Sequence, residues 1–444
     1  MGDKTFRGGV HPAGRKELSK ECPLTPYLPK GELVYLTSQH IGKPATVVVA
    51  KGDHVLAGQV LAEANGFVSA NIISSVSGTV KAVEPRAGAA GNMIMAVVVE
   101  NDGQYTLAEG IGQVCDDSQL TSQQIIDKVR AAGIIGMGGA GFPTHVKLLV
   151  KEPEKINYVI ANGAECEPYI TCDDQLMRTS AQEIVGGLEI MLRLYPNAKG
   201  VIAIENNKPE AIAAMQEACA GSERISVMPL QAKYPQGGER SLISVIAGKH
   251  LKLGMLPADA GCVVDNIATV QAIYRAVHLN EPLMERGVTV SGESIVTPAN
   301  FMVKIGTNVQ ELVDACGGYK EGAEPKKVLF GGPMMGVPLV NLNTPVCKNN
   351  NAITALPFDQ VEEAEKQMTA CLRCGRCSRV CPLGLSPQLM QVAAERKDYE
   401  RYEKKLYGLE CIGCGTCTYN CPAKRPLMQL FKVTKAEILA AKKH

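Results

Sequence analysis

The chain has 444 residues, 45% of them hydrophobic and 20% charged, and its formal net charge is +1. This length provides for roughly three domains with sizeable cores, and the balanced charge excludes a general basic surface for nucleic acid. No run of about 18 or more apolar residues is present, so we expect no membrane-spanning helix. We recognise no signal peptide and expect a protein of the reducing cytosol, either soluble or attached to a membrane through partners.

Residues 1–112 are predicted to form a small β domain. Short runs rich in valine are punctuated by glycine, which is typical of a barrel or sandwich. Residues 52–59 (Gly-Asp-His-Val-Leu-Ala-Gly-Gln) and 74–80 (Ser-Ser-Val-Ser-Gly-Thr-Val) resemble the biotinyl/lipoyl-type barrel-sandwich domains. Those carriers place a modifiable lysine at a hairpin tip, whereas the tip here reads Asn-Gly-Phe at residues 65–67. We therefore expect a structural module rather than a carrier.

Residues 113–284 are predicted to form an α/β domain. Helical periodicity covers residues 122–132, and further helices are expected at 182–194 and 210–219. Short buried strands are expected at 157–161 and 200–204. Alternation of this kind indicates a largely parallel sheet.

A glycine-rich segment lies inside this domain, where residues 136–147 read Gly-Met-Gly-Gly-Ala-Gly-Phe-Pro-Thr-His-Val-Lys. It contains G-x-G-x-x-G, but the Rossmann fingerprint needs a strand before the loop and a helix directly after it. Here a helical pattern precedes the loop, and Phe142-Pro143 follows it. Four glycines in six residues still let backbone N–H groups approach a phosphate or a flat ring, and Lys147 can meet negative charge.

Residues 285–345 return to a β-rich pattern that fits a small β-grasp module, and a linker with three consecutive asparagines (349–351) is expected after it. Residues 355–432 are predicted to form an α-helical domain. Residues 433–444 are predicted to be a basic amphipathic tail. That tail is either a packed helix with a solvated face or a contact for a membrane surface or partner.

Two cysteine runs, residues 371–382 and 411–422, both read C-x2-C-x2-C-x3-C-P. This is the bacterial [4Fe-4S] spacing, in which the cysteine before proline ligates the other cluster. A zinc site would need paired C-x2-C or Cys/His sets, and disulfides would suit a small secreted protein. The predicted ligand sets are Cys371, Cys374, Cys377 and Cys421 for one cluster, and Cys411, Cys414, Cys417 and Cys381 for the other.

Four segments resemble, in the same order, the NADH-oxidising flavoprotein subunit of respiratory complex I and the related diaphorase subunits of hydrogenases. They are the glycine loop and residues 162–168 (Asn-Gly-Ala-Glu-Cys-Glu-Pro), 234–242 (Tyr-Pro-Gln-Gly-Gly-Glu-Arg-Ser-Leu) and 265–269 (Asp-Asn-Ile-Ala-Thr). The resemblance implies a multidomain fold: an N-terminal barrel-sandwich (lipoyl-like) domain, an α/β FMN/NADH domain, a β-grasp (SLBB-like) domain and an α-helical ferredoxin domain with two [4Fe-4S] clusters.

Residues 5–12 (Thr-Phe-Arg-Gly-Gly-Val-His-Pro), residues 39–42 (Gln-His-Ile-Gly) and the doubled cluster motif resemble the C subunit of the Rnf complex. Rnf complexes are membrane-bound, ion-pumping oxidoreductases that couple NADH and ferredoxin. The resemblance implies a peripheral subunit on the cytoplasmic face of the membrane. It would pass electrons from NADH through FMN to two clusters and on to the other Rnf subunits, reversibly, with ferredoxin as an indirect partner.

The resemblance also implies roles for single residues. NADH would face Phe142, Glu167 and Glu239, through ring stacking and hydrogen bonds. Hydride transfer to a flavin needs no acid or base, so we expect no catalytic side chain. The chain departs from the family at Ala164 and Gly238, where the family has acidic residues. The residues implied to hold FMN are Gly136, Gly138, Gly139, Lys147, Asn162, Glu165, Tyr234, Gly237, Asn266 and Thr269.

Two alternative functions remain at this point. Cobalamin reductases of bacterial microcompartments resemble the same layout of barrel, flavin domain and two clusters. A pure electron-relay subunit with a decayed nucleotide site would account for the departures at Ala164 and Gly238.

Overall fold

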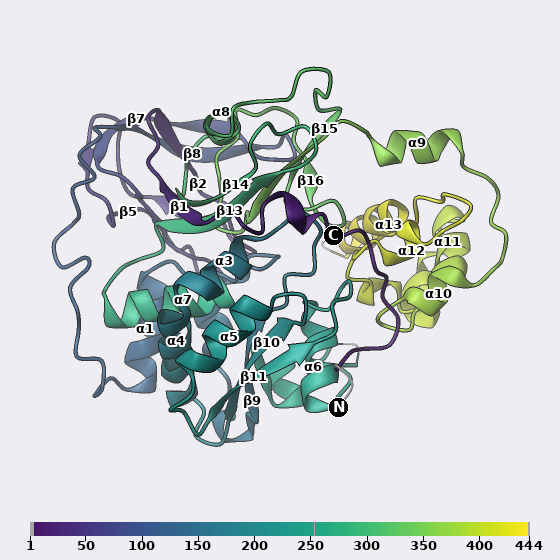
Figure 1. Ribbon diagram of the computed structural model, residues 1–444, viewed down its shortest axis with the longest axis horizontal. Helices are drawn as coiled ribbons and strands as arrows, with labels where there is room; N and C mark the ends of the chain where they lie inside the picture. Colours follow the sequence, from purple (N-terminus) through teal and green to yellow (C-terminus); the bar gives the residue numbers. More distant parts are fainter. Residues whose placement is uncertain (1–3, 253, 443–444) are drawn as a thin grey trace.

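Four folded units follow one another along the chain in the order that the sequence predicts (Figure 1). The computed structural model describes residues 4–252 and 254–442. The units are a barrel-sandwich domain, an α/β domain, a sheet of the β-grasp kind, and a helical domain with the two cysteine runs. The predicted fold class is therefore confirmed. Within the described ranges, no helix combines the length and the apolar character needed to cross a membrane.

Two small antiparallel sheets, ordered β2-β8-β7-β4 and β3-β5-β6, form the barrel-sandwich domain. Leu33 and Tyr35 on β2 and Val97 and Val99 on β8 are fully buried, because residues two apart on a strand share one face. The strands are β2 (Glu32–Leu36), β3 (Thr46–Val47), β4 (His54–Val55), β5 (Val60–Glu63), β6 (Ile72–Ile73), β7 (Gly78–Ala87) and β8 (Met93–Asn101).

The hairpin tip between β5 and β6 is docked rather than free. The carbonyl oxygen of Phe67 lies 3.2 Å from Nε2 of His145 on α2 (Thr144–Leu148). Nδ2 of Asn71 donates to the carbonyl of Ala131 at 3.1 Å. A carrier arm needs a tip that can swing, so these contacts agree with a structural module.

The structure places residues 4–27 outside the barrel that we predicted for residues 1–112. β1 (Leu24–Tyr27) pairs in parallel with β14 of the β-grasp sheet. A strand of four residues has too short a pattern to reveal which sheet it joins. Before it, the short helix η1 (Lys16–Leu18) and residues 4–15 run across the rest of the molecule.

The α/β domain has a parallel sheet with the order β11-β10-β9-β12. The chain moves outward from β9 to β10 and β11, and then crosses to the other side of β9 to form β12. The strand order therefore reverses between β9 and β12. The elements are α1 (Ser122–Ala131), α2, η2 (Pro153–Lys155), β9 (Tyr158–Gly163), α3 (Cys172–Thr179), α4 (Ala181–Arg193), β10 (Lys199–Glu205), α5 (Pro209–Ala218), β11 (Ile225–Leu230), α6 (Glu239–Ala247), η3 (Pro257–Ala260), β12 (Cys262–Asn266) and α7 (Ile267–His278).

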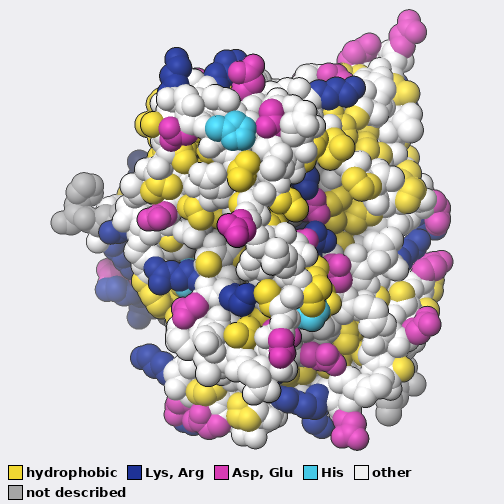
Figure 2. Space-filling model, turned by 90° about the vertical axis from the view of Figure 1, so that its left-hand side faces the viewer, with side chains coloured by type: hydrophobic (Ala, Val, Ile, Leu, Met, Phe, Trp, Pro, Cys, Tyr) yellow, Lys and Arg dark blue, Asp and Glu magenta, His cyan; other side chains and the backbone are white. Residues whose placement is uncertain are grey.

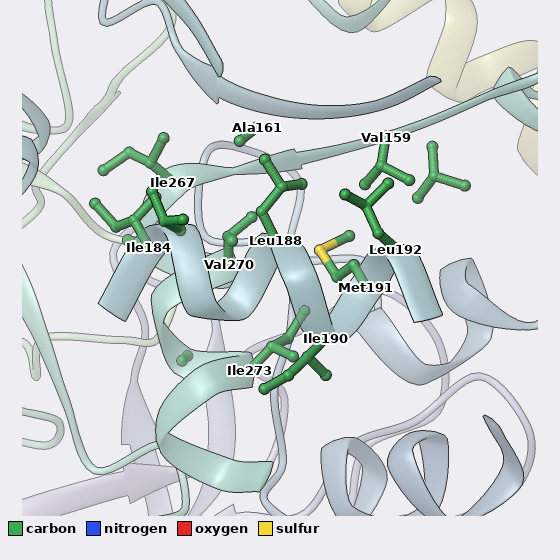
Figure 3. Packing of buried hydrophobic residues seen from close by; sticks show 14 of the residues in the cluster. Val159, Ala161, Ile184, Leu188, Ile190, Met191, Leu192, Ile267, Val270 and Ile273 are labelled. Carbon is green, nitrogen blue, oxygen red and sulfur yellow. The ribbon is translucent and has the colours of Figure 1, made fainter. Parts of the chain in front are cut away.

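The core of this domain lies where α4 and α7 pack under the sheet (Figure 3). Ile184, Leu188 and Met191 are at spacings of three and four along α4 and are fully buried. The two helices approach closely at Gly187, where an added Cβ would lie 2.0 Å from the carbonyl oxygen of Val270. This crossing fixes α7, whose first turn borders the site described below.

The third unit is a mixed sheet with the order β1-β14-β13-β17-β15-β16, covered by α8 (Val309–Ala315). It extends beyond the predicted range of 285–345, because β17 (Ala352–Leu356) lies between β13 and β15. The expected linker is also wrong, since Asn350 is 2% exposed and its Nδ2 donates to the carbonyl of Ala352. Asparagine favours loops, but here it is bonded inside the fold. The other strands are β13 (Glu285–Ser291), β14 (Ala299–Lys304), β15 (Lys327–Phe330) and β16 (Val337–Pro338).

The helical domain contains two similar turns, each followed by a longer helix. α10 and α12 begin directly after Gly375 and Gly415, which both have positive φ. α13 continues across the predicted boundary at residue 432, because Phe431 and Ile438 are buried on one face and Nζ of Lys435 donates to the carbonyl of Leu409. Up to residue 442, the predicted tail is therefore not separate from the helical domain. Residues 443 and 444 lie outside the described ranges. The elements are α9 (Gln360–Lys366), α10 (Arg376–Val380), α11 (Pro387–Glu395), η4 (Arg401–Lys405), η5 (Gly408–Glu410), α12 (Thr416–Tyr419) and α13 (Leu427–Ala441).

Basic and acidic side chains are interspersed over the face drawn in Figure 2. This distribution agrees with the net charge of +1, and that face has no single-sign field of the kind that binds nucleic acid.

Candidate functional site

The point where the strand order reverses, between β9 and β12, is where open α/β sheets bind their ligands, at the carboxyl ends of the strands. Asn162 near the end of β9 and Asn266 at the end of β12 lie opposite each other in the register. Both belong to the predicted FMN set. Because residues 164–167 follow β9 directly, the acidic segment also lies at this edge.

The glycine loop lies against the same edge. The backbone N–H of Met137 donates to Oγ1 of Thr269 on α7 at 2.9 Å, and that of Gly136 donates to the carbonyl of Phe142 at 2.8 Å. An added Cβ on Gly138 would lie 2.9 Å from Cβ of Asn266, whereas one on Gly139 would meet no described atom within 4 Å. The loop thus packs tightly on one side and leaves bare backbone facing open space on the other, as the approach of a phosphate or a flat ring requires.

The two asparagines and Gly237 hold the site together. Nδ2 of Asn162 donates to the carbonyl of Gly237 at 2.9 Å. Nδ2 of Asn266 donates to Oδ2 of Asp173 at 2.7 Å, while its Oδ1 accepts from the N–H of Ala268 and caps α7. A Cβ on Gly237 would lie 2.3 Å from the carbonyl oxygen of Ala164, so glycine is required there.

Lys147 is engaged by protein groups. Its Nζ donates to the carbonyl of Val264 at 2.7 Å and lies 3.3 Å from Oε1 of Glu239 and 3.5 Å from Oδ1 of Asp265. Burial alone would lower the pKa of Lys147, but the charges of Asp265 and Glu239 outweigh it and raise that pKa. Lys147 therefore stays charged at the rim of the glycine loop.

Asp265 is a site residue that was given no role from the sequence. It is 2% exposed, burial raises its pKa, and neither carboxylate oxygen accepts a hydrogen bond from the described residues. An acidic residue at the end of an apolar strand is the signal that points to it.

Glu165 lies in a buried group of charges. Its Oε1 accepts from the N–H of Asp173 at 2.8 Å, and its Oε2 lies 3.7 Å from Nζ of Lys16. Burial raises the pKa of Glu165 to about 8. Lys208 belongs to the same group through an ion pair with Glu205 at 3.0 Å. Lys16, Asp173 and Lys208 were not predicted from the sequence, and the consecutive acids at the start of α3 were the available signal.

Glu167 contacts the β-grasp unit. Its Oε2 and Oε1 accept from the N–H groups of Met334 at 3.1 Å and Met335 at 2.8 Å. Burial raises its pKa to about 7. The structure therefore places both oxygens on backbone donors. Of the other residues expected to face NADH, Phe142 is half-buried and the Glu239 side chain is 41% exposed.

Tyr234 connects this edge of the sheet with the cysteine-rich domain. Its ring is 1% exposed, and its Oη donates to the carbonyl of Cys414 at 2.8 Å. Burial raises its pKa far above the ordinary value, so the hydroxyl keeps its proton. Arg240, at the start of α6, forms an ion pair with Glu410 next to the second cysteine run.

The structure brings together the four cysteines of each predicted ligand set. One cavity is lined by Cys411, Cys414, Cys417 and Cys381, and the other by Cys371, Cys374, Cys377 and Cys421. The first cavity includes the buried Cys414 and Cys417 and adjoins Tyr234, whereas Cys371 and Cys374 in the second are exposed. Four thiols around a cavity fit a cubane cluster.

Exposed arginines alternate with the cysteines of the first run. Arg373, Arg376 and Arg379 are all exposed, and none takes part in the ion pairs found among the described residues. Arg373 lines the exposed cysteine cavity, and Arg376 and Arg379 lie within six residues of Arg373 in the sequence. This exposed stretch is therefore basic, although the whole chain is nearly neutral.

A glycine loop with open backbone lies at the switch point of a parallel sheet, and Tyr234 joins this edge to a domain with two four-cysteine cavities. This combination defines the class of iron–sulfur flavoprotein oxidoreductases. Four family models match in chain order: "RnfC Barrel sandwich hybrid domain" at residues 4–104, "Nuo51 FMN-binding domain" at 129–275, "SLBB domain" at 288–338 and "4Fe-4S dicluster domain" at 364–422. The predicted FMN and [4Fe-4S] classes of cofactor are thereby confirmed.

Similar curated proteins span almost the whole chain. The C subunit of the proton-translocating ferredoxin:NAD(+) oxidoreductase complex of Clostridium ljungdahlii is 40% identical, over 99% of this chain and 95% of its own. The Na(+)-translocating counterpart of Acetobacterium woodii is 41% identical, over 99% and 98%. The C subunit of the ion-translocating oxidoreductase complex of Rhodobacter capsulatus is 42% identical, over 98% and 83%. The chain belongs to the family of C subunits of ion-translocating (Rnf-type) oxidoreductase complexes, which confirms the predicted resemblance.

Two similar solved structures are those of NAD+-reducing [NiFe]-hydrogenase. The air-oxidized state gives a TM-score of 0.48 at 20% identity, covering 73% of this chain and 66% of that one. The H2-reduced state gives a TM-score of 0.49 at 19% identity, covering 74% and 67%.

Proposed function

We propose that this chain is the NADH-oxidising subunit of a membrane-bound Rnf-type complex, peripheral and on the cytoplasmic face, in a reversible ferredoxin:NAD+ oxidoreduction coupled to ion transport. The supporting observation is the hydrogen bond from Tyr234 to the carbonyl of Cys414, which joins the glycine-loop edge directly to a four-cysteine cavity. NADH gives up a hydride with two electrons and leaves as NAD+, whereas a cluster accepts one electron at a time. A nucleotide site and a one-electron site must therefore lie side by side.

The residues at the edge of the sheet fit a flavin mononucleotide. The open backbone at Gly139 and the charged Lys147 suit a phosphate, and the N-terminus of α7 adds favourable dipole ends. Bound FMN would supply the conversion between a hydride and single electrons. In this proposal Asn162, Asn266 and Thr269 orient the loop, while Glu165, Gly237 and Tyr234 line the opposite side.

Phe142 and Glu239 are the residues we propose to meet NADH, since both keep exposed surface beside the glycine loop. Glu167 contributes by holding residues 334 and 335 of the β-grasp unit in place. With hydride transfer to a flavin, the protein positions the two rings and excludes water, so no acid or base is assigned.

The two cysteine cavities take unequal positions in this proposal. The set with Cys381, Cys411, Cys414 and Cys417 adjoins Tyr234 and receives electrons first. The set with Cys371, Cys374, Cys377 and Cys421 opens to the surface and passes electrons to partner subunits. The exposed arginines around it favour a partner with an acidic face.

The test is a measurement on the isolated full-length chain. After cluster reconstitution we expect flavin absorbance, eight iron atoms for two clusters, and NADH:ferricyanide activity. An iron–sulfur protein that binds no flavin and leaves NADH unoxidised would refute the proposal in favour of an electron-relay subunit. Efficient NADH-driven reduction of cob(II)alamin would favour a cobalamin reductase instead.

A further inference from the structure

The segment Phe6 to Val10 runs between the flavin side of the molecule and the cysteine-rich domain, where the N-terminal chain passes beside both in Figure 1. On the flavin side, Val10 and Tyr234 exchange two backbone hydrogen bonds of 2.9 Å. On the cluster side, the N–H of Gly9 donates to the carbonyl of Val380 at 2.8 Å. Two adjacent residues therefore bind two different domains.

Two glycines make this passage possible. Gly8 and Gly9 have φ values of +86° and +79°. A Cβ on Gly8 would lie 2.8 Å from the carbonyl oxygen of Cys381, and one on Gly9 would lie 2.7 Å from that of Tyr234. We call residues 6–10 the strap. We call the cluster site lined by Cys381, Cys411, Cys414 and Cys417 the inner cluster. The strap thus contacts the backbone of Cys381, a proposed ligand of the inner cluster, and that of Tyr234, a proposed flavin residue.

Val10 fills the space between the same two domains. It is 6% exposed and packs in one cluster with Tyr234 and Cys414, beside Met334 and Val380. Lys233 holds the other end of the strap, because its Nζ donates to the carbonyl of Phe6 at 2.8 Å and lies 4.6 Å from the centre of the Phe6 ring.

Interfaces between domains of one chain are usually small, and relative motion is the default unless something fixes them. The rate of electron transfer between two sites falls steeply as their separation grows, so a contact that keeps the separation short also keeps the transfer fast. We propose that residues 6–10 are a positioning strap that sets the separation of the flavin site from the inner cluster. The inference rests on the proposed function, and it assigns a role to the Gly-Gly-Val motif that the flavin and cluster sites leave unexplained.

The test compares Gly8→Ala and Gly9→Ala with Gly14→Ala in the full-length protein. At Gly8 the added methyl must move roughly 0.7 Å to reach an ordinary contact distance of about 3.5 Å. Gly14 belongs to the same segment, but its Cβ would meet, among described atoms, only Cγ of Lys16 at 3.9 Å. Val10→Ala adds no atoms, so it tests the strap even if the glycine variants fold poorly.

Stopped-flow mixing with NADH separates two phases, bleaching of the flavin and then of the clusters. We expect the first phase to be unchanged and the second to slow on the order of 10- to 100-fold in the Gly8 and Gly9 variants, since small misplacements can have effects of that size. Val10→Ala should slow the second phase less, and Gly14→Ala should match the wild type. Wild-type rates in both glycine variants, or equal slowing of both phases, would overturn the proposal.

Hydrogen exchange gives a second readout that needs neither flavin nor NADH. We expect faster exchange at residues 376–381 in the Gly8 and Gly9 variants, and unchanged exchange there would contradict the strap. Failure of the proposed function has a different signature, because the wild-type protein itself would then show no flavin phase.

Discussion

Replacing Glu167 with alanine distinguishes a nucleotide-binding role of this side chain from a structural role. The sequence implied that it faces NADH, whereas the structure places both of its oxygens on the N–H groups of Met334 and Met335. The carbonyl of Met334 in turn lies 3.2 Å from where a Cβ on Gly415 would be, so this loop adjoins the inner cysteine cavity. Loss of the carboxylate should therefore loosen a contact between three domains.

The expected loss in the free energy of unfolding follows from the two hydrogen bonds that Glu167 accepts. Because the pKa of Glu167 is about 7, the group is mainly protonated at pH 6, and each hydrogen bond that it accepts contributes about 0.5–1.5 kcal/mol. A buried donor left without a partner costs about 1–3 kcal/mol. Met335 is 46% exposed, so water can replace the bond to its N–H group. The bond to the N–H group of Met334 dominates, and removal of a buried carboxyl group recovers part of its desolvation cost. We expect Glu167→Ala to lower the free energy of unfolding by about 2 kcal/mol near pH 6.

The effect should depend on pH. Burial raises the pKa of Glu167 from 4.5 to about 7, so the folded state binds the proton more tightly than the unfolded state. The stability that the protonated group contributes is complete below about pH 4.5 and is lost as the pH rises toward 7. The difference between wild type and Glu167→Ala should therefore shrink between pH 5 and pH 8.

Urea unfolding at several pH values and NADH kinetics provide the assay. Glu362→Ala is a matched control, because Glu362 forms an exposed pair with Lys366 at 2.7 Å, and exposed pairs of this kind contribute little to stability. Unchanged stability of Glu167→Ala together with a raised KM for NADH would refute the structural reasoning and place the side chain at the nucleotide.

Cys374→Ala should remove one cluster signal in low-temperature EPR and about half of the iron, because Cys374 lines the exposed cavity with Cys371, Cys377 and Cys421. Flavin should stay bound. Loss of both cluster signals would contradict the predicted ligand sets. Arg376→Glu with Arg379→Glu should weaken binding to membranes stripped of peripheral proteins, most strongly at low salt, whereas Lys51→Glu on the barrel should not. Equal binding of both variants would exclude the basic rim as a docking surface. Gly187→Ala should destabilise the α/β domain by about 1–3 kcal/mol, since its Cβ would lie 2.0 Å from the carbonyl of Val270. Gly221→Ala, whose Cβ would meet no described atom within 4 Å, should leave the melting temperature unchanged.

Local patterns in the sequence predicted much of the fold and of the site. The cysteine spacing specifies which thiols can reach one cavity, and the glycine loop is recognisable within 12 residues, because both depend on neighbours along the chain. Element types followed from periodicity, so α4 was expected at 182–194 and is found at Ala181–Arg193.

Contacts between segments that lie far apart in the sequence could not be predicted from such local patterns. Lys16 reaches Glu165, and Glu167 reaches Met334, across more than 140 residues. Neither partner has a local signal, so Lys16 was missed and the contact of Glu167 with Met334 was not expected. β1 and β17 were not predicted for the same reason, because a segment of four or five residues does not indicate which sheet it joins.

The six-stranded sheet also has a consequence for biosynthesis. Translation makes its interior strand β17 (Ala352–Leu356) some 325 residues after its edge strand β1 (Leu24–Tyr27). At about 5–20 residues per second, β1 waits roughly 15–65 s for the sheet to be completed. During that interval the nascent chain exposes unpaired strand edges, so a chaperone that shields residues 24–27 would favour correct assembly in the cell.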